Sequence, residues 1–198
     1  MNRGLLVDTI AFEVSQDQIH ESINRNAGRL VVKGTLQRAE STNQNGRVYP
    51  RDILVREAKK YTTEFIKQRR AMGELDHPDS SVVNLSNVSH NVLEMHWSGN
   101  DLVGTIEVLS TPSGNILKEL FKSGIKLGIS SRGLGSIKQE AEGDEVQQDF
   151  ELIAFDFVSN PSTQGAFLQP VNEAKGSDGA RGKWTHVELA IRHILLGN

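Results

Sequence analysis

Apolar and polar residues alternate in several short stretches of the chain, which is the pattern of half-buried β-strands. Turn formers separate most of these stretches, and four of them in a row at 98–101 predict an antiparallel hairpin. The last stretch is too rich in apolar residues for a solvent-facing edge, which favours a strand buried on both faces. The six predicted strands cover residues 4–14, 29–37, 88–97, 102–109, 125–131 and 148–158.

Two other stretches repeat apolar residues every three or four positions, the period of an amphipathic helix. The first follows Pro50, a residue suited to the first helical turn, and runs to Arg70. The second follows Thr111, a good helix cap, and stops at Gly124. The polar residues between the first two strands predict a loop. Because strands outnumber helices, we expect an α+β fold, a mixed and mostly antiparallel β-barrel with surrounding helices.

The composition changes after Pro170. Glycines, small residues and charged residues then fill a segment without large apolar side chains, which predicts a linker. A capping box at Thr185 and an apolar helical face follow, so we expect a terminal amphipathic helix that either packs on the barrel or binds a partner. The predicted units are residues 1–27 (an N-terminal strand or extension), 28–173 (the barrel domain), 174–183 (the linker) and 184–198 (the helix).

Composition and charge exclude several classes of protein. The 198 residues are 37% hydrophobic, enough for one sizeable core. The formal net charge of −3 argues against a nucleic-acid binder. The absence of cysteine excludes disulfides, thiolate zinc sites and cysteine nucleophiles. No apolar run approaches the roughly 20 residues that cross a bilayer, and the N-terminus has no signal-peptide pattern, so we expect no membrane partner.

Three polar clusters could carry chemistry. The motif GELDHP at 73–78 places His77 in a loop between predicted elements, where functional residues concentrate. Paired serines at 130 and 131 lead from a strand into glycines that permit close backbone approach. Asp156 stands between two phenylalanines, and a carboxylate there needs a partner. Together the clusters supply a nucleophile, a base and an orienting acid, the minimum set for acyl transfer without cysteine.

The sequence resembles the prohead core proteases of T-even-like tailed phages, serine peptidases that mature the procapsid and are similar to the herpesvirus assemblins. The resemblance covers residues 28–170 and implies an assemblin-like barrel. The motifs that carry it are NGRVYP at 45–50, GELDHP at 73–78, GISSRGLGS at 128–136, and the segment from Phe150 through Asp156 to Ser162.

The resemblance also implies residue roles. By its motifs, His77 is the general base and Ser130, the first serine of the pair, is the nucleophile. Ser131, Arg132 and Gly133 are expected to shape the site around it. No metal or organic cofactor is implied.

The third member of the catalytic set is less directly given by the resemblance. The assemblins use a second histidine on a strand after the nucleophile, and this chain offers Asp156 there. We prefer Asp156 to His90, which precedes the nucleophile. An aspartate can accept the imidazole N–H and stabilise the imidazolium that forms during attack. Backbone N–H groups at Gly133 or Gly165 are candidate oxyanion donors.

The family cleaves scaffold and capsid proteins after glutamate in the prohead interior, within the host cytoplasm. Two glutamates of this chain lie in similar contexts, Glu173 at the start of the linker and Glu21 near the N-terminus. Cleavage at Glu173 would release the terminal helix, because a Gly-rich segment can extend into an active site.

The alternative function is that of a non-catalytic structural or scaffold-binding head protein with the same barrel. The two functions differ in whether His77, Ser130 and an acid lie together. The sequence leaves open whether the chain forms a homo-oligomer.

Overall fold

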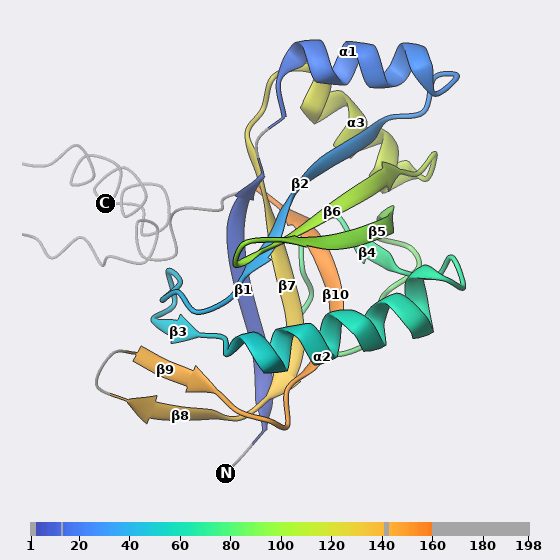
Figure 1. Ribbon diagram of the computed structural model, residues 1–198. Coiled ribbons are helices and arrows are strands. Elements are labelled where there is room, and N and C mark those ends of the chain that lie inside the picture. The colour runs from blue at the N-terminus through green and yellow to red at the C-terminus, as the bar shows by residue number, and fades with distance from the viewer. Residues whose placement is uncertain (1–2, 13, 141–142, 160–198) are drawn as a thin grey trace, which may run out of the picture. The chain divides into compact units, whose positions relative to one another are not determined.

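The computed structural model describes residues 3–12, 14–140 and 143–159, and every structural statement below concerns those residues (Figure 1). The helices are α1 (Gln16–Arg25), α2 (Arg51–Tyr61), its π-helical continuation η1 (Thr62–Ile66) and α3 (Pro112–Lys122). The strands are β1 (Gly4–Phe12), β2 (Val31–Arg38), β3 (Arg47–Val48), β4 (Met72–Glu74), β5 (Val88–Ser98), β6 (Asp101–Val108), β7 (Leu127–Gly135), β8 (Ile137–Glu140), β9 (Gly143–Val146) and β10 (Glu151–Val158).

The described strands form three sheets. The first has the order β1-β7-β10, the second β2-β6-β5-β4 and the third β3-β9-β8, and only the β3–β9 pairing is parallel within them. A single bridge between Leu75 and Phe157 joins the end of β4 to β10. The expected α+β class with mostly antiparallel strands is confirmed. The described residues do not close the predicted barrel, because β1 and β2 end their sheets without sharing a hydrogen-bond ladder, and the likeness to an assemblin barrel stays a prediction.

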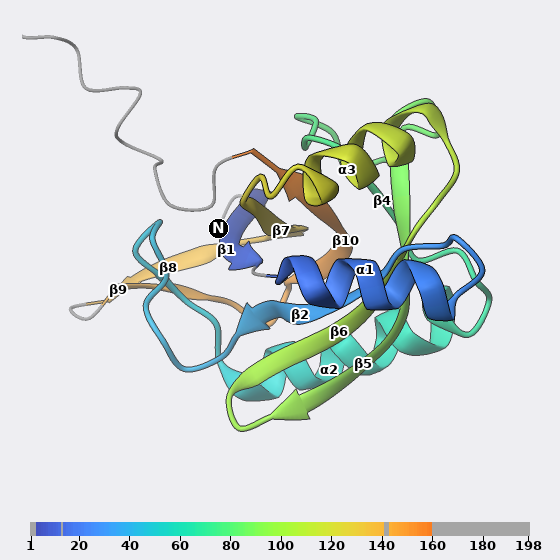
Figure 2. The same cartoon turned by 90° about the horizontal axis from the view of Figure 1, so that it is seen from above.

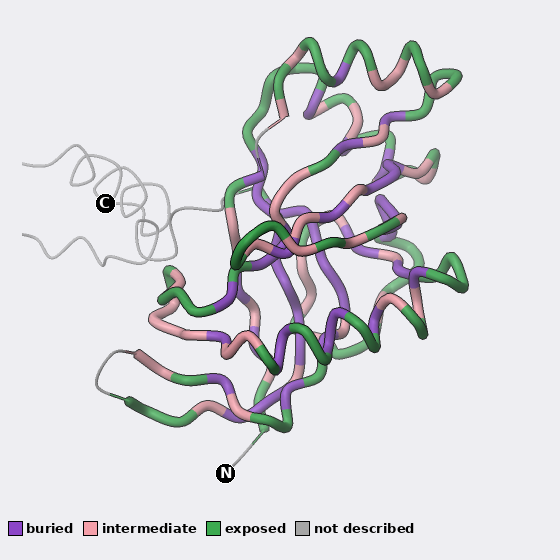
Figure 3. Tube along the Cα trace, in the orientation of Figure 1, coloured by how far each residue is buried: buried purple, intermediate pink, exposed green. Residues whose placement is uncertain are grey.

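The helices lie at two ends of the sheets. Figures 1 and 2 show α1 and α3 together at one end and α2 at the other. Buried positions follow the strands between them (Figure 3). An aromatic cluster joins the first sheet to α3: the ring of Phe157 meets Phe12 at 5.1 Å and Phe121 at 5.4 Å, both edge-on. Edge-to-face pairs of this kind stabilise a core beyond their buried area.

Most elements form where the pattern predicts them, and their ends have identifiable causes. The Oγ1 atom of Thr111 accepts a hydrogen bond from the Gly114 N–H at 3.0 Å and so caps α3. Gly124, with φ at +73°, ends that helix. The turn between β5 and β6 has Gly99 at φ +58°. The predicted helix from Pro50 to Arg70 becomes α2 and η1, and the π-helical turn begins with two threonines whose hydroxyls donate to backbone carbonyls of the preceding turn.

The structure corrects the region between the first two strands. The predicted loop is α1, which Ser15 and Gln18 begin with a reciprocal capping box. The sequence of this helix, QDQIHESINR, lacks a wide apolar stripe, and only Ile19 is fully buried. The apolar pattern therefore does not predict it. The short strands β3, β4, β8 and β9 were also missed, because two to four residues are too few to show a period.

The N-terminal strand, β1, belongs to the first sheet. β1 pairs with β7 along its whole length, from Gly4 opposite Gly135 to Phe12 opposite Leu127. The predicted linker at 174–183 and helix at 184–198 lie outside the described residues. Across residues 3–159, apart from the short gaps named above, no helix combines the length and apolar character needed to cross a membrane.

The cap of α1 is testable by Ser15→Ala, which removes the acceptor of the Gln18 N–H bond. We expect the free energy of unfolding to fall by about 1 kcal/mol. Urea denaturation followed by circular dichroism measures it. Ser86→Ala, at an exposed loop serine, is the matched control and should change the stability little. Equal stability of the two variants would show that the capping box contributes nothing.

Candidate active site

Strand pairing brings Ser130 and Asp156 together. They are directly opposed in the ladder of β7 and β10, with Thr9 of β1 opposite Ser130 on the other side. Directly opposed residues point to the same face with Cβ atoms about 4.5–5.5 Å apart. The neighbouring pair, Ile129 and Phe157, points to the other face, which carries the aromatic cluster. Ser130 and Asp156 are both fully buried.

The structure distinguishes the two serines. The hydroxyl of Ser131 accepts a hydrogen bond from Gln37 Nε2 at 2.7 Å and donates to the Asp8 carbonyl at 3.4 Å. The hydroxyl of Ser130 is buried and has no hydrogen-bond partner among the residues that the structure describes. Because a buried hydroxyl without a partner costs free energy, native structures seldom keep one without a functional reason. Ser130 is therefore the serine with a hydroxyl free to react.

His77 follows β4, whose end lies along β10 on the side opposite to β7. After the Leu75–Phe157 bridge, the Asp76 N–H donates to the Phe157 carbonyl at 2.8 Å. Asp76 has φ at +64°, a left-handed conformation that aspartate tolerates and that turns the chain. His77 follows and is half-buried, and its Nδ1 atom is buried without a partner.

Arg132 connects the segments of the site. Its wholly buried guanidinium donates to both Asp156 oxygens, at 2.8 and 3.2 Å, and to Glu74 Oε1 at 3.0 Å. It also donates to the Ser80 carbonyl at 2.7 Å, which fastens the loop that follows His77. Burial raises the pKa of Asp156, and the Arg132 charge opposes that rise. The expectation that Asp156 needs a partner is thus met by Arg132.

Asp156 makes no hydrogen bond to His77 in the described structure. Its Oδ1 atom accepts from the Glu74 N–H at 3.0 Å as well as from Arg132. The rival residue, His90, is also engaged elsewhere: Nε2 lies 2.9 Å from the Phe155 carbonyl and Nδ1 lies 2.8 Å from Ser89 Oγ. His90 is therefore a histidine of the core, and its ring is not free to orient another side chain.

Glu74 is the residue that the sequence analysis missed as an individual. It is fully buried, and its Oε1 atom accepts from Arg132 and from the Asn84 N–H at 3.0 Å. Its Oε2 atom is buried and has no hydrogen-bond partner. Its place in GELDHP, three residues before His77, was the available signal. The sequence pattern alone could not show which acidic residue of that motif, Glu74 or Asp76, takes part in the site.

The NGRVYP motif supports the sheet from its other face. Asp8, opposite Ser131 in the β1–β7 ladder, accepts hydrogen bonds from Asn45, Arg47 and the Tyr49 hydroxyl. Burial is the main cause that raises the pKa of Tyr49, and the negative charge of Asp8 adds to it. This motif holds β1 against β7 and contributes no atom to the face of Ser130.

The structure also describes the surroundings of Gly133 and Glu21. Gly133 packs closely, since a Cβ there would lie 2.4 Å from the Phe150 ring, so glycine is required by packing. Its role as an oxyanion donor stays a prediction, and Gly165 lies outside the described residues. Glu21 is in the middle of α1, paired with Arg25, and the preceding Ile19 is buried. Glu173 lies outside the described residues.

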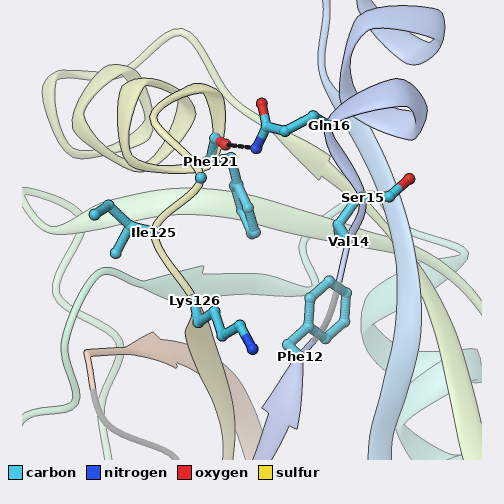
Figure 4. A pocket seen from close by; sticks show the side chains of 8 residues that line it. Phe12, Val14, Ser15, Gln16, Phe121, Ile125 and Lys126 are labelled. Carbon is cyan, nitrogen blue, oxygen red and sulfur yellow. Dashed lines mark hydrogen bonds between the residues drawn. The ribbon is translucent and has the colours of Figure 1, made fainter.

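A pocket of about 390 Å³ lies elsewhere, between the start of α1 and the end of α3 (Figure 4). Its wall includes Phe12 and Phe121, and Gln16 Nε2 donates to the Phe121 carbonyl at 2.9 Å. Because Phe12 points to the face opposite Ser130, the pocket is separate from the candidate site. Within the described ranges, no group of histidine and acidic side chains could hold a metal ion.

Burial of His90 predicts a pH dependence of stability. Burial lowers its pKa from 6.5 to about 4, so between these values the unfolded chain takes up a proton that the folded chain does not. The free energy of unfolding should therefore fall as the pH falls through this window, by at most about 1.4 kcal/mol per pH unit. Urea denaturation across pH 4–7 measures the slope. His90→Gln should flatten it, whereas His96→Gln, at an exposed histidine, should not.

Comparison with known proteins identifies the family. A family model described as "Prohead core protein serine protease" matches residues 7–176. The prohead core protein protease of Enterobacteria phage T4 is 34% identical over 145 residues, which cover 71% of this chain and 68% of that protein. The solved structure of the bacteriophage T4 capsid assembly protease matches with a TM-score of 0.70 at 27% identity, covering 81% of this chain and 100% of that one. The chain therefore belongs to the prohead core protein serine proteases, a family of proteases that act in phage head maturation.

Proposed function

We propose that this chain is a serine endopeptidase that cleaves phage scaffold and capsid proteins after glutamate, inside the prohead, during maturation. The observation that carries the proposal is the hydroxyl of Ser130, buried without a partner where Asp156, Arg132 and the loop after His77 converge. The names of the relatives, prohead core protein protease and capsid assembly protease, support head proteins as the substrate class.

In the proposed mechanism, His77 takes the proton of the Ser130 hydroxyl, and the serine oxygen attacks the scissile carbonyl. The protonated imidazole then gives that proton to the leaving amine, and water hydrolyses the acyl-enzyme. Asp156, opposite Ser130, supplies negative charge to the site as a member of the cluster held by Arg132. Ser130 and His77 make no hydrogen bond to each other in the described structure, and catalytic bonds of this kind often tighten only in the complex with substrate.

The non-catalytic alternative explains the site less well. A purely structural sheet would satisfy its buried polar atoms, as this chain does at Asp8 and Ser131. In the two family motifs, however, the Ser130 hydroxyl and the His77 Nδ1 atom both lack hydrogen-bond partners among the described residues. Unsatisfied buried polar groups cost stability, so their coincidence in two family motifs favours catalysis.

Of the two glutamates considered for self-cleavage, Glu173 is the better candidate. Glu21 would have to leave α1, lose its ion pair with Arg25 and expose Ile19 before its peptide bond could enter an active site. Glu173 precedes a Gly-rich segment whose sequence imposes no such cost. We therefore propose self-cleavage after Glu173.

Matched alanine variants test the nucleophile. Ser130→Ala should lose about 10⁶-fold in kcat, because no other group can form the acyl-enzyme. Ser131→Ala should keep most of the activity but lose about 1–3 kcal/mol of stability, because it leaves the buried Gln37 amide without an acceptor. Cleavage of a glutamate-containing scaffold peptide and urea denaturation measure the two effects. Comparable losses of activity in both variants would contradict the assignment of Ser130.

Intact mass spectrometry tests self-processing. After identical expression and incubation, the wild-type chain should yield a species ending at Glu173 that is absent from Ser130→Ala. Glu173→Gln should abolish that species, and the matched control Glu21→Gln should leave it unchanged. An intact wild-type chain that still cleaves a separate peptide would overturn self-processing and leave the protease assignment in place.

A further inference from the structure

The described residues contain five buried side-chain atoms without a hydrogen-bond partner, and three belong to the two motifs of the active site. These three are Ser130 Oγ, His77 Nδ1 and Glu74 Oε2. They are a hydroxyl, a ring nitrogen and a carboxylate oxygen, the atom types that a catalytic triad joins. Each would find a suitable donor or acceptor in another member of the set.

The strand order sets Glu74 close to Ser130. Asp156 is opposite Ser130 on one side of β10, and its Oδ1 atom accepts from the Glu74 N–H on the other side. Ser130, Asp156 and Glu74 thus lie on three neighbouring strands, β7, β10 and β4. His77 follows Glu74 by three residues, after the left-handed turn at Asp76.

The charges leave one acceptor unused. Arg132 donates to both oxygens of Asp156 and to Oε1 of Glu74, so three of the four carboxylate oxygens already have a cationic partner. Two carboxylates face one guanidinium, and all three groups are fully buried. A buried carboxylate oxygen without a donor is unfavourable, and a protonated imidazole would supply both the hydrogen and the compensating charge.

We propose that Glu74, rather than Asp156, is the positioning residue that contacts His77, an inference that rests on the proposed protease function. Oε2 of Glu74 accepts the Nδ1–H of His77 and so fixes the tautomer whose Nε2 takes the Ser130 proton. Asp156 and Arg132 act one step further away by holding Glu74 in place. Neither atom has a partner among the described residues, and a turn of the half-buried His77 ring toward β4 forms the bond.

The test compares two isosteric variants of the full chain, Glu74→Gln and Asp156→Asn, in cleavage of a glutamate-containing scaffold peptide. Glu74→Gln should lower kcat by about 10⁴-fold with little change in KM, as expected when a triad carboxylate no longer fixes the tautomer. The acidic limb of its pH–rate profile should move to lower pH, because the imidazolium loses its adjacent negative charge. Asp156→Asn should retain more activity, and Glu74→Asp should restore part of the loss.

A spectroscopic readout separates positioning from a merely structural role. In the Ser130→Ala background at acidic pH, where both ring nitrogens are protonated, we expect a downfield Nδ1–H proton resonance that His77→Asn removes. Glu74→Gln should abolish this resonance, and Asp156→Asn should retain it. If Glu74→Gln does not fold, Glu74→Asp, which keeps the charge but withdraws the oxygen, should weaken the resonance and lower kcat.

Opposite behaviour of the two variants would assign the contact to Asp156 and overturn the proposal. Loss of activity in Glu74→Gln with the resonance and the pH profile unchanged would make Glu74 structural only, and would overturn it as well. Failure of the proposed function itself has a different signature, since wild type would then leave the peptide uncleaved, or Ser130→Ala would cleave it as fast as wild type.

Discussion

The site depends on one buried guanidinium. Arg132 emerges from β7 and bonds to Asp156 on β10, to Glu74 on β4 and to the Ser80 carbonyl in the loop after His77. It thereby joins the first sheet, β1-β7-β10, to the second, β2-β6-β5-β4, which a single β-bridge between Leu75 and Phe157 connects in the described backbone. Desolvating three charged groups is costly, and such a cluster rarely contributes net stability compared with apolar residues. In the proposed mechanism, the role of Arg132 in holding the catalytic groups accounts for the cost.

The alternation of side chains along β7 separates two tasks. Ser131 faces the side where Gln37 and the Asp8 cluster anchor β1, so its hydroxyl is used in the structure. Ser130 and Arg132 face the other side, where the groups of the active site meet. Because the side-chain period of a strand is two, a slip of one residue would exchange these tasks. The aromatic contacts of Phe12 and Phe157 on the anchored face oppose such a slip.

Much of the fold could be predicted from the sequence. Local sequence signals predict three of its parts, and tertiary contacts do not change them: the hairpin of β5 and β6, the cap of α3 at Thr111 and the helix after Pro50. The helix α1 escaped prediction because it buries only Ile19 fully and relies on a capping box. Whether the predicted barrel closes could not be read from the sequence, because the number of strands does not say which edges pair, and β1 and β2 share no hydrogen-bond ladder.

The sequence by itself determined the chemical groups: a histidine in GELDHP, a serine pair entering a glycine-rich strand, and an aspartate between aromatic residues. It also carried the family resemblance, since short motifs can be recognised by their residues even though their positions in the chain do not show which of them are in contact. Only the tertiary structure decided which serine keeps a free hydroxyl, that Asp156 belongs to Arg132, and that Glu74 has an unused oxygen. Those facts depend on strand register and on contacts between residues far apart in the chain. They matter because a buried polar atom without a hydrogen-bond partner costs free energy.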